Sequence, residues 1–427
     1  MKLVEKELTM LNVERARQNP ELEKLNETEQ KLTPRNPELL NELFRAQALP
    51  VEQVYLSSPY DKFSLRVRCS YKPEGLEFTT TQKSRGEIVE DALQRGEVEE
   101  EISEEAYNYY RDLDLPIVRK LRAKVMDGVT VDFYDDDTEP VIVEIEDNDP
   151  EVRVQMLKMM QELSGGDLVD RSDDPALTNE AIAHRQYEQS GKTEHLKAKP
   201  ESLDHFSDRV LGEMVAQYAT GRDRVVVGLT GMSGSGKTTV TTALQERIVE
   251  MFGEAYKPIV ISTDDYHFGK KRLEEEYGTP YNDWDDGKTY DTDQLAADLT
   301  VLAEGLPIPS RHFDFDTEEP SFDGVIENSP FVIIEGLYAG SKNLDAVRTI
   351  HFQLPTGIAT AVGRDVRRLV IDNRANRAFP TPQSRLKYQI EVALPKYLEQ
   401  QMPQLTAFSA STRPLASRAF MLAELSK

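Results

Sequence analysis

The sequence predicts two folds in one chain, an antiparallel β-barrel in the N-terminal part and an α/β domain with a parallel sheet in the C-terminal part. Between about residues 27 and 146, charged residues stand two apart in several short runs, as they do along one face of a β-strand. From residue 225 onward, short apolar runs alternate with helix-like segments, and a glycine-rich turn follows the first of them. A polar stretch with glycine and proline lies between the two patterns and is typical of a linker.

The composition predicts a soluble, cytoplasmic protein of two or three domains. The 427 residues are enough for several separate cores, and 30% of them are charged. No run approaches the roughly eighteen apolar residues that a membrane-spanning helix needs, and the first thirty residues lack the apolar core of a signal peptide. The single cysteine, Cys69, excludes an intramolecular disulfide and a cysteine zinc cluster, which fits a reducing compartment.

The net charge of −25 restricts the partners that the protein can bind. An acidic surface repels polyanions, so neither a nucleic acid nor an anionic membrane is expected as a partner. Sites for phosphate must then be local concentrations of Lys and Arg. The expected partners are a small-molecule phosphate acceptor and a triphosphate ligand, and a homo-oligomer is compatible with the sequence.

Four segments follow from these patterns. Residues 1–25 are a polar, Glu-rich lead-in, and residues 26–190 contain the charged runs. Residues 191–205 are the linker, and residues 206–427 form the α/β domain.

The charged runs of the N-terminal part place their charges on one strand face and their spacers on the other. For one run alone, the simpler interpretation is an ordinary antiparallel sheet whose charges face water. Because both signs recur across several strands, the set favours a closed barrel with a charged, wet interior, in which Lys and Arg bind a polyphosphate and carboxylates hold metal ions. The runs are Glu27–Lys31, Arg66–Arg68, Glu97–Glu99, Lys120–Arg122 and Glu144–Glu146.

The order of motifs in this part is Glu27–Lys31, Val51–Leu56, Ser64–Arg68, Thr79–Lys83, Arg95–Glu99, Arg119–Arg122, Val131-Asp132 and Glu144–Glu146. Over about residues 26–190 it resembles the CYTH, or triphosphate tunnel, superfamily. The resemblance implies an eight-stranded antiparallel tunnel that binds triphosphate compounds with magnesium or with manganese. Asp167–Asp170 followed by Pro175–Asn179 resembles the C-terminal helical tail of that family.

The resemblance also implies roles for single residues. Metal-binding or water-positioning carboxylates are expected at Glu27, Glu29, Glu144 and Glu146, with Glu97 and Glu99 sharing that work. Triphosphate is expected to contact Lys31, Arg66, Arg68, Lys83, Lys120 and Arg122. The usual aromatic residue after the Lys-x-Arg element is replaced by Ala123, and Asp135–Asp137 adds acid nearby. A tunnel that binds triphosphate without hydrolysing it is therefore an open alternative.

The α/β domain begins with a phosphate-binding loop, or P-loop. Gly231–Thr238 fits the pattern Gly-x-x-x-x-Gly-Lys-Ser/Thr and follows the β-branched run Val225–Val227. The backbone N–H groups of such a loop surround phosphate, Lys237 reaches the terminal phosphates, and the Thr238 hydroxyl ligates magnesium at a helix N-terminus. A plain glycine-rich turn is the weaker interpretation. Nucleotide contacts are expected from Gly231, Ser233, Gly234, Ser235, Gly236, Lys237, Thr238 and Thr239, with ATP and Mg²⁺ as cofactors.

Two further apolar strands are expected beside the P-loop strand. Pro258–Thr263 ends at Asp264, and Phe331–Ile334 ends at Glu335. Ligands of a buried parallel sheet bind at the carboxyl ends of its strands, so these acids stand where magnesium ligation and a catalytic base are needed. Otherwise an acid at a strand end is a solvated turn or a helix cap. Before the sheet, Asp204–Gly221 has the apolar spacing of a helix that packs on it.

The motifs of this part are Gly231–Thr238, Ser262–Tyr266, Asn282–Asp286 with Tyr290-Asp291, Phe331–Gly336, and Gly363–Arg368 with Arg374 and Arg377. In this order, over about residues 222–400, they resemble the uridine kinase and phosphoribulokinase group of P-loop kinases. The resemblance implies that Asp264 is the general base, that Glu335 supports magnesium through water and that the arginine-rich helix forms a lid.

A lid arginine that closes over the γ-phosphate stabilises its charge and excludes water. The expected catalytic residues are Lys237, Asp264, Arg367 and Arg368. A solvated basic helix face is the alternative for Arg364, Arg367 and Arg368, although at least one arginine is expected in the lid.

The phosphate acceptor is less well defined. Uridine kinases carry a Tyr-Asp-Phe-x-x-His-x-Arg element, and this chain has Phe313–Pro320 in its place. Asp314 and Phe315 match, whereas Glu318 stands at the His position and Pro320 at the Arg position. A nucleoside such as uridine or cytidine is the best candidate, and another hydroxylated small molecule is the alternative.

The sequence thus predicts a kinase that transfers the γ-phosphoryl group of ATP to a small hydroxyl acceptor, with an N-terminal tunnel that binds or hydrolyses triphosphate. One alternative is a triphosphatase in the tunnel with the P-loop domain as its ATP-binding regulator. Another is a tunnel that only senses triphosphate and controls the kinase through the linker. A nucleotide-driven switch without an acceptor is a third.

Overall fold

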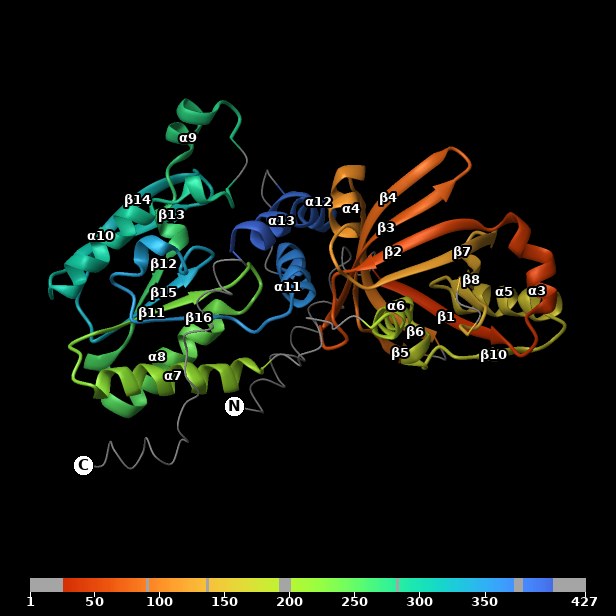
Figure 1. Ribbon diagram of the computed structural model, residues 1–427, viewed down its shortest axis with the longest axis horizontal. Coiled ribbons are helices and arrows are strands. Elements are labelled where there is room, and N and C mark those ends of the chain that lie inside the picture. Colours follow the sequence, from red (N-terminus) through yellow and green to blue (C-terminus); the bar gives the residue numbers. More distant parts are fainter. Residues whose placement is uncertain are drawn as a thin grey trace. The chain divides into compact units, whose positions relative to one another are not determined.

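The computed structural model describes residues 26–89, 92–135, 138–191, 201–281, 284–371 and 379–401. The predicted lead-in, residues 1–25, and most of the predicted linker lie outside these ranges. The chain forms two compact units (Figure 1). The N-terminal unit combines Met1–Lys199 with Gly357–Glu391, and the C-terminal unit combines Pro200–Thr356 with Val392–Lys427.

The N-terminal unit contains a closed antiparallel barrel of eight strands, which confirms the predicted fold. The strands follow the order β1-β9-β8-β7-β2-β3-β4-β6, and pairing of β6 with β1 closes the ring. Short strands β5 and β10 pair with β6 and β1. The strands are β1 (Asn26–Pro34), β2 (Leu49–Tyr55), β3 (Phe63–Lys72), β4 (Gly75–Ser84), β5 (Glu87–Val89), β6 (Ala92–Glu101), β7 (Ile117–Met126), β8 (Val129–Tyr134), β9 (Ile142–Glu146) and β10 (Leu168–Asp170).

The barrel wall separates charged from apolar side chains, as the period-two pattern predicts. On β9, for example, Glu144 and Glu146 line the interior, whereas Val143 and Ile145 are buried in an apolar cluster with Met156 of the helix α5. Removing such aliphatic groups from water stabilises the wall by about 25 cal/mol for each Å² of apolar surface that is buried. The helices beside the barrel are α3 (Glu38–Phe44), α4 (Glu104–Arg111), α5 (Pro150–Leu163) and α6 (Asn179–Gln189), with 3₁₀ turns at Arg45–Gln47 and Pro175–Leu177.

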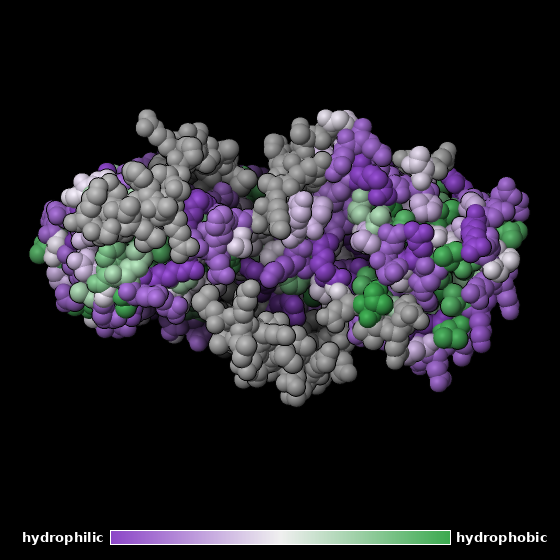
Figure 2. Space-filling model, turned by 90° about the horizontal axis from the view of Figure 1, so that it is seen from below, coloured by the Kyte–Doolittle hydropathy of each residue, from purple (hydrophilic) through white to green (hydrophobic). Residues whose placement is uncertain are grey.

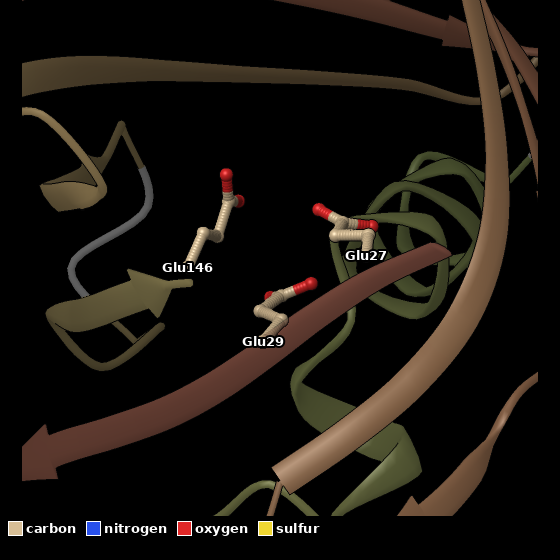
Figure 3. A group of neighbouring side chains, drawn as sticks. All are labelled: Glu27, Glu29 and Glu146. Carbon is tan, nitrogen blue, oxygen red and sulfur yellow. The ribbon is translucent and has the colours of Figure 1, made fainter. Parts of the chain in front are cut away.

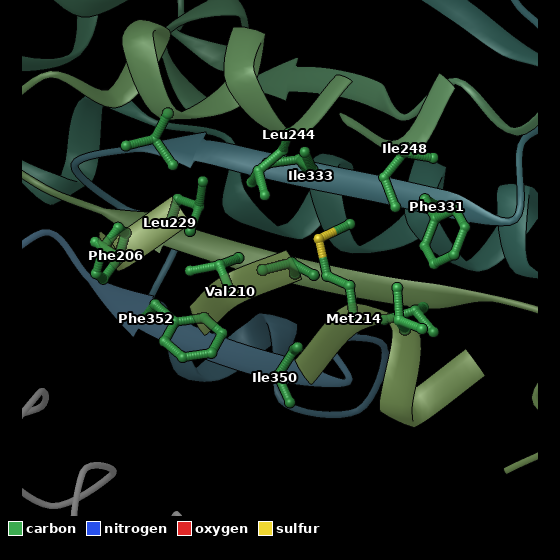
Figure 4. Packing of buried hydrophobic residues seen from close by; sticks show 14 of the residues in the cluster. Phe206, Val210, Met214, Leu229, Leu244, Ile248, Phe331, Ile333, Ile350 and Phe352 are labelled. Carbon is green, nitrogen blue, oxygen red and sulfur yellow. The ribbon is translucent and has the colours of Figure 1, made fainter. Parts of the chain in front are cut away.

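The C-terminal unit is built on a parallel four-stranded sheet of order β12-β15-β11-β16, which confirms the predicted α/β fold. Helices α7 (Leu203–Ala219) and α8 (Lys237–Phe252) supply Phe206, Met214 and Leu244 to the apolar cluster with Phe331 and Phe352 of the sheet (Figure 4). Helix α10 (Thr292–Ala303) contributes Leu295, Leu299 and Leu302 to a second cluster with β12 and β15. The strands are β11 (Val225–Thr230), β12 (Ile259–Ser262), β15 (Phe331–Gly336) and β16 (Ile350–Gln353), and the hairpin strands are β13 (Ile308–Asp314) and β14 (Glu319–Ile326).

The helices of this unit include α7, which confirms the helix predicted over Asp204–Gly221. The Ser202 hydroxyl caps α7 by accepting from the His205 N–H at 3.2 Å. The helices are α7 (Leu203–Ala219), α8 (Lys237–Phe252), α9 (Lys270–Tyr277), α10 (Thr292–Ala303) and α13 (Leu394–Lys396). Short turns are η3 (Glu254–Tyr256), η4 (Thr263–Tyr266), η5 (Gly287–Thr289), η6 (Lys342–Leu344) and the π turn η8 (Tyr397–Gln401). The π turn η7 (Gln389–Ala393) contains residues of both units.

Helices α11 (Ile358–Ile371) and α12 (Pro382–Tyr388) pack in the N-terminal unit, although the sequence assigned all of residues 206–427 to the C-terminal domain. The close approach of α11 to β3 accounts for this difference. A Cβ at Gly363 would lie only 2.5 Å from the Phe63 ring, so the glycine lets the helix and the strand touch. A contact of this kind between distant segments leaves no periodic signal in the sequence.

Hydrophilic side chains cover much of the described surface on the face shown in Figure 2, as the high charge content leads one to expect. Within the described ranges, every helix is too short or too polar to cross a lipid bilayer.

His351 on β16 should make the C-terminal unit sensitive to acid. Its Nε2 lies 2.7 Å from the Thr230 hydroxyl, and burial together with nearby Arg348 lowers its pKa to about 3. Because the unfolded chain binds this proton near pH 6.5, the contribution of neutral His351 to stability is complete above that pH and is lost as the pH falls toward 3. The free energy of unfolding falls by at most about 1.4 kcal/mol per pH unit from this group. We expect thermal unfolding between pH 7.5 and 5 to show a smaller fall in Tm for His351→Gln than for the unchanged chain. Equal falls in Tm for the two chains would show that His351 does not cause the sensitivity to acid.

Candidate functional site

The interior of the barrel is a cavity of about 630 Å³. Its wall carries more carboxylates than Lys and Arg side chains, so a bare polyphosphate would meet a net negative interior. Divalent cations bound to the carboxylates would reverse this balance. The charged residues that line it are Glu27, Glu29, Lys31, Arg66, Arg68, Lys83, Arg85, Arg95, Glu97, Glu99, Arg122, Glu144, Glu146, Asp173, Asp174 and Glu180.

Three of these carboxylates form a group suited to a metal ion. Ligand oxygens of Glu27, Glu29 and Glu146 lie within 4.8 Å of one another, and the three side chains share one space inside the barrel (Figure 3). Strands β1 and β9 bring them together, because Glu29 and Glu146 are paired in register. Burial, with the charges of Glu144 and Glu27, raises the pKa of Glu146 to about 7. Three oxygen donors crowded in this way fit a hard divalent cation such as Mg²⁺ or Mn²⁺.

Basic side chains surround this group. Lys83 Nζ contacts both carboxylate oxygens of Glu27, at 2.9 and 2.8 Å, and one oxygen of Glu97 at 3.0 Å. Arg95 Nε donates to Glu27 at 3.1 Å, and its Nη2 contacts Glu29. Burial raises the pKa of Glu27, but the charges of Lys83 and Arg95 outweigh it and hold that pKa below its usual range. Arg95 was not among the predicted phosphate contacts, although its position two residues before Glu97 extends the same alternation.

Other predicted phosphate contacts lie along the cavity wall. Lys31 Nζ contacts Glu29 at 2.6 Å and Glu144 at 3.5 Å, and Arg68 donates to Glu99 at 3.0 Å. Arg66 Nε is buried and has no hydrogen-bond partner among the described residues. A buried donor without a partner is costly, and a phosphate oxygen would satisfy it.

Lys120 is the exception among the predicted phosphate contacts. It is fully buried, donates to Asp132 at 2.5 Å and to Asn179 Oδ1 at 2.9 Å, and is absent from the residues that line the cavity. Burial and the charge of Arg122 lower its pKa to about 8. These contacts indicate a structural ion pair inside the wall.

Replacing Asp132 with alanine should destabilise the N-terminal unit by about 3–5 kcal/mol, because Lys120 would remain buried without its counter-ion. The measurement is urea unfolding followed by circular dichroism. Asp127→Ala is the matched control, since Asp127 also pairs with a lysine, Lys124, but is 97% exposed. Similar losses for the two variants would show that the buried pair has no special importance.

Helix α6 contributes residues to the cavity that were not among the predicted site residues. Asn179, Glu180 and His184 lie on this helix and line the cavity. Glu180 accepts from the guanidinium of Arg85 and from the Ser57 hydroxyl. The only sequence signal for them was the resemblance of this region to a helical tail, which gives no direction to single side chains.

The P-loop connects β11 to α8 in the C-terminal unit. Gly234 and Gly236 have positive φ angles of 77° and 97°, which glycine adopts without strain. Lys237 Nζ donates to the carbonyls of Gly231 and Met232 at 2.9 and 3.1 Å. The Ser235 hydroxyl is buried without a hydrogen-bond partner in the described part of the chain. An unsatisfied donor in such a loop fits a phosphate ligand.

Two acidic residues stand at the carboxyl edge of the same sheet. Glu335 pairs in register with Leu229 on β11 and with Ser262 on β12, and Asp264 follows β12 in η4. Burial raises the pKa of Glu335, the charge of Lys237 opposes this and Asp264 adds to it. Glu335 Oε2 is buried and lacks a hydrogen-bond partner among the described residues. Thr238 lies in the first turn of α8. The residues predicted to hold Mg²⁺ and ATP therefore meet at one edge, and the orphan oxygen fits a metal or its bound water.

Aromatic side chains gather near Asp264. The ring nitrogens of His267 lie 2.8 Å from the Asp264 carbonyl and 3.1 Å from the Trp284 carbonyl. The His267 ring centroid is 3.9 Å from that of Tyr290 and 5.0 Å from that of Phe313. These contacts indicate that His267 stabilises the packing of this aromatic group.

The predicted acceptor loop lies in the hairpin β13–β14. Glu318, at the position of the uridine kinase histidine, has a positive φ of 58° and pairs with Lys270. Phe315 is 63% exposed. His312 is half exposed and lies 3.0 Å from Asp323.

The arginine-rich helix α11 lies in the N-terminal unit. The Arg367 guanidinium stands 5.9 Å from the centre of the Phe63 ring on β3. Arg364 is also in this helix, whereas the side chain of Arg368 and the whole of Arg374 and Arg377 lie outside the described part. The structure therefore joins the predicted lid helix to the barrel.

Comparison with known proteins finds a match to a family model within the C-terminal unit. Residues 226–353 match the model of the Phosphoribulokinase / Uridine kinase family. This match confirms the resemblance seen in the motifs of the C-terminal part.

Two curated relatives are also kinases by name. The bifunctional alpha-galactosidase/sucrose kinase AgaSK of Mediterraneibacter gnavus is 31% identical over 186 residues, which are 39% of this chain and 19% of that protein. A uridine kinase of Staphylococcus epidermidis is 29% identical over 125 residues, 28% of this chain and 55% of that protein. The chain thus spans about a fifth of the first relative and about half of the second.

Among solved structures, an inorganic triphosphatase is similar to 37% of this chain and 93% of its own, with a TM-score of 0.22 and 20% identity.

Proposed function

We propose that the protein is an ATP-dependent phosphotransferase that moves the γ-phosphoryl group of ATP to a small hydroxyl acceptor, and that its barrel binds a triphosphate compound with a divalent cation. The observation that carries the kinase proposal is the meeting of Lys237, Asp264 and Glu335 at the carboxyl edge of the sheet, with Glu335 Oε2 lacking a partner. The family match over residues 226–353 supports the same class of reaction.

The arrangement supports a division of work among these residues. Lys237 would leave the Gly231 and Met232 carbonyls and bind the terminal phosphates of ATP. Thr238 and Glu335 would hold Mg²⁺, directly or through water, and the metal would neutralise charge on the β- and γ-phosphates. Asp264 would accept the proton of the acceptor hydroxyl. The acceptor oxygen then bonds to the γ-phosphorus, the bond from that phosphorus to the bridging oxygen breaks, and ADP leaves.

For the acceptor, a nucleoside such as uridine or cytidine is our first candidate. The aromatic group of His267, Tyr290 and Phe313 could stack on a planar base. A non-nucleoside hydroxyl compound is the second candidate, because Glu318 is held by Lys270 where the uridine kinase element has a histidine. The sucrose kinase name of one relative agrees with that second candidate.

For the barrel, a triphosphate with a divalent cation fits the cavity best. Glu27, Glu29 and Glu146 would hold the cation, and Lys31, Arg66 and Lys83 would bind phosphate oxygens. Hydrolysis in the tunnel is the alternative to binding alone.

The test is a phosphoryl-transfer screen with ATP and Mg²⁺ against nucleosides, sugars and other hydroxyl compounds, detected as acceptor phosphate by mass spectrometry. Asp264→Asn is the variant, since it keeps the shape of the side chain and removes the base. We expect transfer to at least one acceptor and a fall of about 10²- to 10⁴-fold in kcat for the variant. Equal rates for the variant and the unchanged chain would refute Asp264 as the base. Phosphate release from tripolyphosphate without any acceptor product would favour the tunnel as the catalyst.

A further inference from the structure

We propose that a triphosphate bound in the barrel controls the phosphotransferase through Arg85, Asp61 and Thr360, by way of the first turn of helix α11. This inference rests on the proposed function of both units. It assigns the control to a helix that the barrel holds and that continues directly from the P-loop sheet, in place of the linker at residues 191–205.

The first step of this connection lies at the cavity. Arg85 lines the cavity, and its guanidinium contacts Glu180, which accepts from Ser57 as well. The same guanidinium donates from Nε to the Asp61 carbonyl at 2.8 Å and from Nη2 to the Ser58 carbonyl at 2.9 Å. Arg85 therefore ties the loop between β2 and β3 to the cavity wall. Its side chain is 40% exposed, so a phosphate group in the cavity can reach it and compete with Glu180.

The second step is the contact between that loop and α11. Asp61 Oδ1 accepts from the Thr360 backbone N–H at 3.1 Å and from the Thr360 hydroxyl at 2.7 Å. The Thr360 hydroxyl in turn accepts from the Lys62 N–H at 2.9 Å. Asp61 and Thr360 are both buried. A carboxylate at the first turn of a helix stabilises that turn through its N–H groups and the helix dipole, so the position of Asp61 determines how firmly α11 begins.

The third step leads to the P-loop. Thr356, four positions before Thr360, donates from its hydroxyl to the Ser235 carbonyl of the P-loop at 2.6 Å. A Cβ on Gly357 would lie 2.1 Å from Asp61 Oδ1, so this glycine is required for the chain to pass beside the carboxylate. Three covalently joined residues thus connect Thr360, in the first turn of α11, with Thr356 and its hydrogen bond to the P-loop.

The other end of the segment that begins with α11 is also fixed to the barrel side of the chain. The Tyr110 hydroxyl on α4 donates to the Ile390 carbonyl at 2.7 Å, and the Ser103 N–H donates to Glu391 at 2.7 Å. Tyr110 is fully buried. Helix α11, which carries Arg364 and Arg367, contacts β3 and β4, and helix α12 contacts β6.

The expected direction follows from the contacts of Arg85. Phosphate oxygens draw the guanidinium toward the cavity, so the Ser58 and Asp61 carbonyls lose their donor and the loop loosens. The first turns of α11 then open more often, and their backbone amides exchange faster with deuterium. A ligand shifts such an equilibrium only by its differential affinity for the two states, and typical couplings change equilibria by about 5- to 150-fold.

The experiment uses the full chain with Mn²⁺ and inorganic tripolyphosphate as the probe. Calorimetry measures binding, hydrogen–deuterium exchange follows residues 358–366, and ADP formation follows transfer from ATP. We expect exchange in this peptide to speed up by about fivefold or more when tripolyphosphate binds, with a parallel change in ADP formation. Arg66→Ala, which removes a cavity contact, should lose both effects. If α11 still responds in that variant, the signal comes from the P-loop and the inference is refuted.

Variants of Thr360 and Arg85 distinguish a loss of coupling between the barrel and α11 from a loss of tripolyphosphate binding. Thr360→Val should bind tripolyphosphate with unchanged affinity while exchange in residues 358–366 no longer responds, and Thr360→Ser, which keeps the hydroxyl, should restore the response. Arg85→Gln should show fast exchange without any ligand. Normal tripolyphosphate binding with unchanged or slower exchange in the unchanged chain would refute the inference and leave the proposed function intact. Absence of tripolyphosphate binding, with ATP-dependent transfer preserved, would refute the proposed role of the barrel and this inference with it.

Discussion

Lys237→Ala should reduce phosphoryl transfer from ATP by about 10²- to 10³-fold or more, because it removes a positive charge aimed at the phosphates in the transition state. Lys237 is bonded to the Gly231 and Met232 carbonyls, and its charge acts on Glu335. The side chain is therefore already beside the phosphate site and the proposed metal ligand. The measurement is the initial rate of ADP formation with saturating ATP, Mg²⁺ and the acceptor found in the screen.

The controls for this prediction distinguish loss of charge from loss of fold. Lys257→Ala changes an exposed lysine of the same unit, paired with Glu254, and should leave the rate unchanged. Lys237→Arg keeps the charge but not its shape, since a guanidinium is a planar fork where the loop surrounds a compact ammonium, so it should restore little activity. A Lys237→Ala chain with normal transfer would show that this loop does not serve the reaction.

The double variant Glu27→Gln with Glu29→Gln should abolish the dependence of tripolyphosphate binding on divalent cations. In the unchanged chain we expect Mn²⁺ to tighten binding by about 100-fold, because Glu27, Glu29 and Glu146 lie close enough to share one ion. In the variant this factor should fall to about threefold or less. Binding without metal should become tighter than in the unchanged chain, since Lys83 and Arg95 would no longer be paired with these carboxylates.

Calorimetry of tripolyphosphate with Mn²⁺ or with EDTA tests this prediction. Both chains carry Lys237→Ala, so that the P-loop does not contribute to the signal. Glu100→Gln is the matched control: Glu100 neighbours Glu99 on β6 but is absent from the residues that line the cavity. A double variant that keeps the full effect of Mn²⁺ would place the metal elsewhere.

Much of the fold could be predicted because it rests on local patterns. The alternation around Glu144 and Glu146 assigns one strand face to the cavity and the other to the apolar wall, and the P-loop lies where strand and helix signals meet. Asp264 and Glu335 could be placed at one sheet edge from the strand ends alone. Periodicity and motifs carry such information because it depends on neighbours in the chain.

The remaining features depend on contacts between distant segments. Lys120 follows the same alternation as Arg122, yet Asp132 and Asn179 pair with it inside the wall. Arg85 continues the alternation of Lys83, yet its contacts with Glu180 and with the Ser58 and Asp61 carbonyls depend on segments distant in the chain. The sequence also gives no sign that α11 packs on Phe63, because the contact depends on the missing side chain of Gly363. Such pairings follow from three-dimensional packing, which one sequence does not encode in a local pattern.

Because Gly357–Glu391 packs with the N-terminal unit, the two units cannot be separated by cutting the chain at a single position. A fragment that ends before residue 200 would lack α11 and α12 and would leave Phe63 and Tyr110, both now buried, facing solvent. A fragment that begins at residue 200 would carry two helices without the surface they cover. The chain therefore does not divide at one cut into two halves that each keep their own core. Gene duplication or recombination that exchanged one half would have to carry this segment with the barrel, so we expect the two units to be inherited together.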